Sequence, residues 1–328
     1  MRKRLSTALS LVLILITLAT SLIGCAKTEQ PSPPTAPEVA PQAPQYPIHS
    51  ATTRFRIATT TSLYDTGLWY YLEPLFEKYA NVEMDIVYAG TGIALEYGRR
   101  GDVDAVVVHS RADEDKFIAE GYGINRRYFA YNFFLIAGPE TDPAAIKGLA
   151  AVDAFKKIAE EGIKNPDTVK FVSRGDQSGT HVKEQGVWQK AGYKYEDIQK
   201  SGKWYIEAGK GMGPCLLMAS EQQAYILADI STFTAYKGKL KLVSLVEAEE
   251  PTFLNVYAVM AINPDKVPTA KIDIANKFIN WLISPEVQNI LGTYGKAEFG
   301  KPLFRPTSDG SCQMEGCPTV EEYSKPVP

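Results

Sequence analysis

Three junctions rich in hydroxyl groups and glycine stand where β-type runs give way to helical runs. The first is Thr59-Thr60-Thr61-Ser62, the second is Gly90-Thr91-Gly92, and the third extends from Ser173 to Thr180. Each would place backbone N–H groups at a helix N-terminus. Such N–H groups lack intrahelical partners and carry a partial positive charge, so these junctions are suited to binding an anion.

Ordinary helix capping is the alternative, because Ser and Thr are preferred caps in any protein. Capping suffices for Thr91 considered alone. The run from 59 to 62 has more hydroxyl groups than one cap needs. The third junction adds Arg174, whose planar guanidinium is a fork of donors, and Asp176, near enough in sequence to orient it. The same Arg–Asp pair would also fit a surface turn, so both interpretations stay open.

Enzyme chemistry has little support in this sequence. Ser178-Gly179-Thr180 lacks the flanking pattern of a nucleophile elbow. The histidines His49, His109 and His181 are far apart and lack the local spacing of zinc ligands. No phosphate-binding glycine loop followed by Lys-Ser/Thr is present, so the chain is not itself an ATPase. We predict a binding protein with no catalytic residues, no metal site and no cofactor.

The N-terminus has the pattern of an exported lipoprotein. Positive residues precede an apolar run over 11–22 that is too short for an ordinary membrane span. The run ends in Leu22-Ile23-Gly24-Cys25, which resembles the bacterial lipobox, whose cysteine is acylated. We therefore expect a signal peptide over 1–24, a lipid on Cys25 and a proline-rich linker over 25–50 that holds a domain off the membrane. A plain secretory signal with an incidental cysteine is the alternative.

The charge balance excludes one class of partner. Removal of residues 1–24 deletes three positive charges and no acid, which takes the formal net charge from −3 to −6. This acidity argues against nucleic acid as a partner. It also means that local hydrogen bonds would have to capture an anion, since the overall charge repels it.

The remaining cysteines leave one question open. Cys312 and Cys317 flank a short glycine-containing loop near the C-terminus, and they could pair in an oxidising compartment or stay free. Cys215 is better explained as a buried small apolar residue than as a reactive thiol.

Alternation of β-type and helical runs predicts an α/β fold with parallel strands and crossover helices. About 250 folded residues suffice for two modest lobes. We expect strands at 55–59, 84–88, 103–108, 131–137, 168–173, 224–228, 240–245 and 256–262, and helices at 68–79, 93–99, 113–120, 144–161, 178–190, 211–221, 272–283 and 285–291.

Five ordered segments resemble the tungstate-binding proteins of bacterial and archaeal ABC importers, and the resemblance covers about residues 55–305. The segments are the Thr-Thr-Thr-Ser run at 59–62, Gly-Asp-Val-Asp-Ala-Val-Val-Val-His at 101–109, Glu-Gly-Tyr-Gly-Ile-Asn-Arg-Arg at 120–127, Ser-Arg-Gly-Asp-Gln-Ser-Gly-Thr-His-Val-Lys-Glu at 173–184 and Gly-Lys-Gly-Met-Gly at 209–213.

The resemblance implies a two-lobed periplasmic binding protein fold of type II, with two inter-lobe crossovers. One crossover is expected near Tyr131-Asn132 and the return near Asn255-Val256-Tyr257. Lobe 1 would comprise 51–131 plus 256–306, and lobe 2 would comprise 132–255. Residues 307–328 would form a C-terminal tail.

The resemblance also implies which residues hold the oxyanion. Carried over by match, they are Thr60, Thr61, Ser62, Thr91, Arg174, Ser178, Gly179 and Thr180. Two positions depart from the family pattern. Phe133 stands where an acidic residue is expected, and Ile230 stands where arginine is expected after Asp229. Both lie near the lobe crossovers or the edge of the cleft, so ligand preference or lobe closure could differ.

These features together predict an extracytoplasmic, lipid-anchored solute-binding protein that captures tungstate. Its partners would be an ABC permease with a cytoplasmic ATPase, a membrane reached through the lipid on Cys25, and no nucleic acid. We expect a monomer on the outer face of the cytoplasmic membrane or in the periplasm. Molybdate is the nearest competing ligand, and phosphate follows because related phosphate binders have a similar Arg-x-Asp-x-Ser-Gly-Thr loop. A lipoprotein that senses an oxyanion and signals to a membrane partner is the alternative class.

Overall fold

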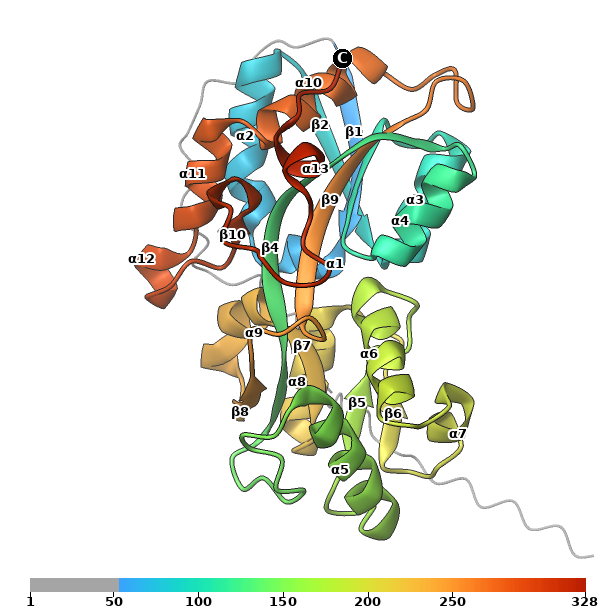
Figure 1. Ribbon diagram of the computed structural model, residues 1–328, viewed down its shortest axis with the longest axis vertical. Coiled ribbons are helices and arrows are strands. Elements are labelled where there is room, and N and C mark those ends of the chain that lie inside the picture. The colour runs from blue at the N-terminus through green and yellow to red at the C-terminus, as the bar shows by residue number, and fades with distance from the viewer. Residues whose placement is uncertain (1–52) are drawn as a thin grey trace, which may run out of the picture. The chain divides into compact units, whose positions relative to one another are not determined.

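A single long strand, β4 (Gly123–Pro139), is shared by two groups of elements (Figure 1). The computed structural model describes residues 53–328. The expected signal peptide, the lipid site at Cys25 and the linker lie outside the described residues. As far as Phe133, β4 pairs with β9 (Leu254–Ile262), and from Phe134 onward it pairs with other strands. One strand therefore takes part in both groups.

The first group, which we call the first lobe, is built on the sheet order β10-β4-β9-β3-β1-β2. Within it, β1 runs parallel to β2 and β3, whereas β3 and β4 are antiparallel to β9. Its remaining elements are β1 (Arg54–Thr60), β2 (Glu83–Ala89), β3 (Ala105–Val108), β10 (Arg305–Pro306), α1 (Thr61–Asp65), α2 (Leu68–Ala80), α3 (Thr91–Arg100), α4 (Arg111–Ala119), α10 (Ile272–Leu282), α11 (Pro285–Thr293) and α12 (Lys296–Phe299).

The second group, the second lobe, uses the other end of β4. Residues Phe134–Pro139 pair antiparallel with β7 (Ile226–Asp229) and β8 (Leu242–Glu247), and β5 (Phe171–Ser173) pairs parallel with β6 (Tyr205–Glu207). Its helices are α5 (Ala151–Lys164), α6 (Gly179–Lys190), α7 (Tyr195–Gln199), α8 (Met212–Gln222), α9 (Ile230–Tyr236) and the short 3-10 helix η1 (Lys237–Lys239).

Each lobe has its own apolar core, as the spacing of apolar residues requires. In the first lobe, α2 buries Leu68, Leu72 and Phe76 on one face, and the ring of Phe76 lies 4.8 Å from that of Phe278 on α10. In the second lobe, Phe155 of α5 meets Trp188 of α6 with ring centroids 4.4 Å apart. Removal of these surfaces from water is the main force that holds each lobe together.

Two expected elements differ most from the structure in their bounds. The strand expected at 131–137 is the much longer β4, because bulges near Ile124 and Tyr128 and a positive φ of 57° at Asn125 interrupt its alternation. The helix expected at 144–161 starts only at Ala151. The backbone before it forms turns, with Ala144 donating its N–H to the Tyr225 hydroxyl at 2.7 Å.

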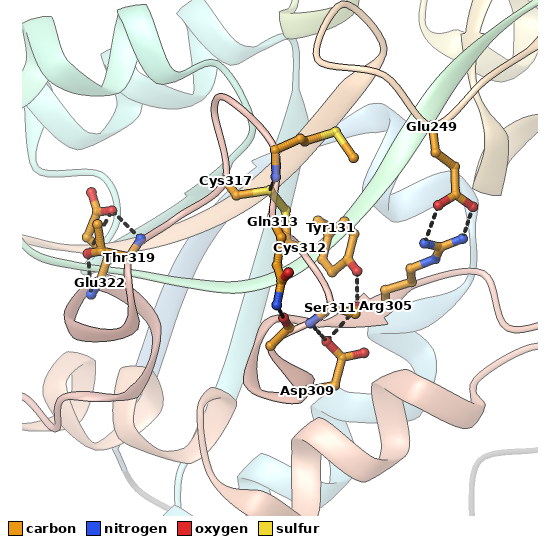
Figure 2. The surroundings of a disulfide bond; sticks show 12 residues. Tyr131, Glu249, Arg305, Asp309, Ser311, Cys312, Gln313, Cys317, Thr319 and Glu322 are labelled. Atoms are coloured by element: carbon orange, nitrogen blue, oxygen red, sulfur yellow. Dashed lines mark hydrogen bonds and ion pairs between the residues drawn. A yellow bond between two sulfur atoms is a disulfide. The ribbon is translucent and has the colours of Figure 1, made fainter.

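The C-terminal segment 307–328 folds against the rest of the chain. It contains η2 (Thr307–Asp309), a disulfide between Cys312 and Cys317, and α13 (Val320–Ser324). The open question of cysteine pairing is thereby answered. Figure 2 shows the disulfide loop beside Tyr131 of β4, whose hydroxyl bonds to Ser311. Cys312 and Cys317 pack on the apolar core of the second lobe, while Val327 is buried in the apolar core of the first lobe.

Candidate functional site

The hydroxyl run at 59–62 spans the end of β1 and the start of α1. Thr60 is the residue before the helix, and its Oγ1 lies 3.3 Å from Ser62 Oγ, with both residues buried. Thr59 faces the core instead, where its hydroxyl accepts from Trp69 Nε1 at 3.1 Å. The run therefore separates into one core hydroxyl and three that lie at the end of the strand.

Arg174 follows β5 directly and lies with only 1% of its surface exposed. Its Nη2 donates to Asp176 Oδ2 at 2.5 Å and, across to the first lobe, to Thr61 Oγ1 at 2.9 Å. Nε donates to the carbonyl of Lys210 at 3.3 Å. Within residues 53–328, Nη1 is buried without any hydrogen-bond partner. The surface-turn interpretation of this arginine is thus wrong, since its charged group is enclosed.

The Ser178-Gly179-Thr180 segment begins helix α6 and meets the second hydroxyl junction. Ser178 caps the helix by accepting from the His181 N–H at 3.3 Å. Gly179 donates its N–H to Thr91 Oγ1, the first residue of α3, at 3.0 Å. Thr180 Oγ1 is buried and, in the part of the chain that the structure describes, has no partner. The structure therefore brings all eight predicted oxyanion residues into one region between the lobes.

Gly179 is required by the closeness of this contact. A Cβ at this position would lie 3.0 Å from His109 Cε1 and 3.3 Å from Thr91 Oγ1. Real side-chain carbons seldom approach neighbours so closely. Absence of a side chain at 179 is what lets the start of α6 reach the first lobe.

Three carboxylates lie near the buried guanidinium of Arg174. Asp176 accepts from Arg174 with one oxygen and from the Ser178 N–H, at 3.2 Å, with the other. Burial raises the pKa of Asp65 to about 6, although the Gly213 N–H and Arg174 oppose that rise. Burial also raises the pKa of Asp229, whose Oδ1 accepts from the Thr232 backbone N–H at 2.9 Å. With these acids so near, an anion bound here would depend on hydrogen-bond donors rather than on net charge.

Several residues of this region were not predicted from the sequence. His109, considered only as a zinc ligand, places Nε2 3.1 Å from Ser62 Oγ. Asp65 accepts from the Gly213 N–H at 3.2 Å, and Thr232 Oγ1 donates to the Ser62 carbonyl at 3.1 Å, so α8 and α9 also touch the first lobe. Asp65 lies in no motif, and only its position in the fold identifies it. His109 is the last residue of the 101–109 segment that resembles the family, and this segment is the signal that could have found it.

The two departures from the family pattern lie together. Phe133 and Ile230 line one cavity of about 470 Å³, along with residues such as Glu249 and Arg305. None of the eight predicted oxyanion residues lines it. Arg305 and Glu249 join there in a bidentate ion pair, drawn in Figure 2.

Among residues 53–328, no group of three or more His, Cys, Asp or Glu side chains is arranged to hold a metal ion. Over the same residues, no helix has both the length and the apolar character needed to cross a membrane.

Comparison with known proteins gives a consistent result. The profile of the PBP superfamily domain matches residues 46–286. The tungstate-binding protein TupA of Peptoclostridium acidaminophilum is 39% identical over 305 residues, which cover 92% of this chain and 98% of that protein.

Two solved structures resemble the chain over most of its described length. The crystal structure of the tungstate ABC transporter from Geobacter sulfurreducens is 46% identical, with a TM-score of 0.65, and the match covers 74% of this chain and 98% of that one. The tungstate-binding protein TupA from Desulfovibrio alaskensis G20 is 36% identical, with a TM-score of 0.64, over 77% of this chain and 98% of that one.

Proposed function

This chain belongs to the PBP superfamily, and the relatives that it matches are substrate-binding proteins of ABC importers rather than enzymes; we propose that it captures tungstate for an ABC importer. The observation that carries the proposal is a pair of unsatisfied donors. Arg174 Nη1 and the Thr180 hydroxyl are both buried without a hydrogen-bond partner in the described region. A buried donor left unpaired is costly, and a tetrahedral oxyanion offers the acceptors that these two groups lack.

The proposed ligand residues come from both lobes. Thr60, Thr61, Ser62 and Thr91 belong to the first lobe, and Arg174, Ser178, Gly179 and Thr180 belong to the second. A ligand that contacts both lobes stabilises the closed arrangement through contacts that an open one would not offer. We divide the lobes at 51–131 plus 256–306 and at 132–255, with β4 and β9 as the two crossing strands.

The protons that an oxyanion carries at neutral pH decide which oxyanion suits the site. Phosphate near neutral pH carries one or two protons, which a free buried carboxylate acceptor would recognise. Asp176 is the nearest candidate, and both of its oxygens are occupied, by Arg174 Nη2 and by the Ser178 N–H. Tungstate and molybdate carry no proton and suit a site in which donors predominate.

The cellular arrangement follows from the proposed role. Delivery to an ABC permease with a cytoplasmic ATPase requires an extracytoplasmic protein. We propose that a lipid on Cys25 anchors a monomer at the outer face of the membrane, and that residues 25–50 serve as its linker.

Calorimetric titration with tungstate, molybdate, sulfate and phosphate tests the function directly. Tungstate should bind most tightly, molybdate should be its nearest rival, and phosphate and sulfate should bind more weakly. Solution scattering should show a smaller radius of gyration with saturating tungstate. Tighter binding of phosphate than of tungstate, or binding of none of the four, would reject the proposal.

A further inference from the structure

A chain of hydrogen bonds runs from the second lobe to the hydroxyl run of the first. His109, which follows β3, is buried between Asn255 of β9 and Ser62 of α1. Its Nδ1 lies 2.8 Å from Asn255 Oδ1, and its Nε2 lies 3.1 Å from Ser62 Oγ. The ring is thus bonded at both nitrogens, and the direction of each bond decides what Ser62 can do.

A backbone carbonyl decides which group donates and which accepts in every hydrogen bond of this series. The Ser231 hydroxyl bonds to the carbonyl of Leu303 at 2.5 Å, and because a carbonyl only accepts, Ser231 must be the donor. Its oxygen is then free to accept from Asn132 Nδ2, at 2.5 Å. That contact fixes the orientation of the Asn132 amide, so Asn132 Oδ1 is the acceptor for Asn255 Nδ2 at 2.8 Å.

The orientation of the Asn255 amide decides which nitrogen of the His109 imidazole carries a hydrogen. With Asn255 Nδ2 donating to Asn132 and, at 2.9 Å, to the Tyr257 hydroxyl, Asn255 Oδ1 is left as an acceptor. His109 Nδ1 must therefore carry a hydrogen. In a neutral ring the other nitrogen, Nε2, is then a bare acceptor, and the Ser62 hydroxyl supplies its hydrogen. In this state Ser62 Oγ can accept from Thr60, 3.3 Å away, but its own hydrogen is committed to His109.

Protonation of the ring reverses only the last bond. Nε2 becomes a donor to Ser62 Oγ, and the Ser62 hydrogen is released for another acceptor. Nδ1 donates to Asn255 in both states, so nothing between Leu303 and His109 has to rearrange. Both protonation states are therefore compatible with the same side-chain positions.

The surroundings oppose the charged ring until an anion arrives. Burial, followed by the charge of Arg174, lowers the pKa of His109 to about 4; the hydrogen bond with Asn255 opposes this shift, and Lys183 adds to it. The other faces of the ring meet Tyr257, Phe134 and the backbone at Gly179, none of which carries charge at neutral pH. A dianion beside Ser62 and Arg174 would offset both cations and favour the imidazolium.

We propose that His109 takes up a proton from solvent when the oxyanion binds, which turns Ser62 from a donor to His109 into a donor to the anion. This inference rests on the proposed oxyanion function and adds its regulation by pH. The proton goes from buffer to His109 Nε2, and no covalent bond to the ligand forms or breaks. Tungstate affinity should then rise as pH falls, by up to about tenfold for each pH unit in the window between the free and bound pKa values of His109.

Calorimetry in buffers of different ionisation enthalpy counts the protons. Titration of the protein with micromolar tungstate should show uptake at about pH 6 and little at about pH 8. His109→Gln keeps a side-chain amide near Ser62 and cannot titrate, so it should still bind tungstate without the proton uptake. His181→Gln serves as the matched control, because that histidine bonds instead to the Gln177 N–H and to Tyr195. It should retain the uptake.

Asp65 is the competing source of a bound proton, since its pKa is already raised to about 6 beside Arg174. Asp65→Asn should leave the uptake in place. Loss of the uptake in Asp65→Asn or His181→Gln together with its retention in His109→Gln would overturn the proposal. Tight tungstate binding by wild type with no uptake at any pH would also overturn it while leaving the proposed function standing. If wild type does not bind tungstate, the proposed function itself fails.

Discussion

The backbone N–H of Gly179 donates to Thr91 Oγ1 at 3.0 Å, which joins the first turn of α6 in the second lobe to the first residue of α3 in the first. Arg174 makes another such link, to Thr61 Oγ1 at 2.9 Å. Both links use residues that we place in the oxyanion site. These two contacts between the lobes therefore use groups that would also contact the ligand.

Gly179→Ala should weaken tungstate binding by about tenfold or more, because an added methyl group would meet His109 and Thr91 within 3.0–3.3 Å. Gly186→Ala is the matched control on the same helix, where a Cβ meets nothing within 4 Å. That change should raise stability by about 1 kcal/mol and leave affinity unchanged. Calorimetric titration and thermal melting of the two variants measure both effects, and equal affinities would show that the lobes close without this contact.

Arg174→Lys should weaken tungstate binding by about tenfold to a hundredfold, since lysine keeps the charge and loses the planar fork of donors. Selectivity among oxyanions should change as well, because sulfate is smaller and requires shorter contacts. Arg99→Lys is the control, because Arg99 lies outside the site and donates to Glu120 at distances of 2.8 and 2.9 Å. This change should leave the affinity for tungstate within error of wild type. If folded Arg174→Lys binds as wild type does, the guanidinium is not a ligand.

Glu114→Gln should make the protein less sensitive to rising pH. Burial raises the pKa of Glu114 to about 8, partly opposed by Arg126 and Tyr128. A folded state that holds this proton more tightly than the unfolded chain loses stability as pH increases from the ordinary glutamate pKa toward about 8. Urea unfolding at a series of pH values should show a falling stability for wild type and a flatter profile for the variant. Parallel profiles would mean that Glu114 is ionised in the folded protein.

Replacement of Cys312 and Cys317 by serine should destabilise the fold by about 2 kcal/mol, the value expected for closure of a short loop. The disulfide loop packs on the core of the second lobe, so the loss should appear in the melting of that core. A reducing agent should produce a similar drop in wild type and none in the double variant. A reductant effect that persists in the variant would point to some other cause.

Acylation of Cys25 should place the protein in the membrane fraction of its native host. Metabolic labelling with a fatty acid should mark wild type and fail to mark Cys25→Ala, which should be released or stay attached only through an uncleaved signal. A wild-type protein that takes up no label would contradict the lipoprotein assignment.

Elements whose apolar residues repeat at one regular spacing were predicted more accurately from the sequence than the strand that is shared between the lobes. The face of α2 that buries Leu68, Leu72 and Phe76 is a plain helical repeat. The start of β4 was missed because Asn125 and two bulges interrupt the alternation, and the pairing with β9 that makes this stretch a strand is distant in sequence.

In the candidate site, residues that are neighbours in the sequence were predicted, and residues that only the fold brings together were not. Ser178, Gly179 and Arg174 stand in one continuous segment, so the sequence could suggest them together. His109, which follows β3, and Asn255 of β9 lie 2.8 Å apart although they are distant along the chain, and no spacing in the sequence connects the two. Contacts of that kind exist only once the topology has formed.

The unbroken course of β4 through both lobes has a mechanical consequence. Because β4 and β9 are paired at Asn132 and Asn255, where the first lobe gives way to the second, rotation of one lobe against the other twists two strands joined edge to edge. In such a pair of strands the strain of twisting would spread over many residues and grow with the angle of rotation. Opening would then be a small, elastic displacement with a restoring force, unlike the free swing of two domains on a flexible linker.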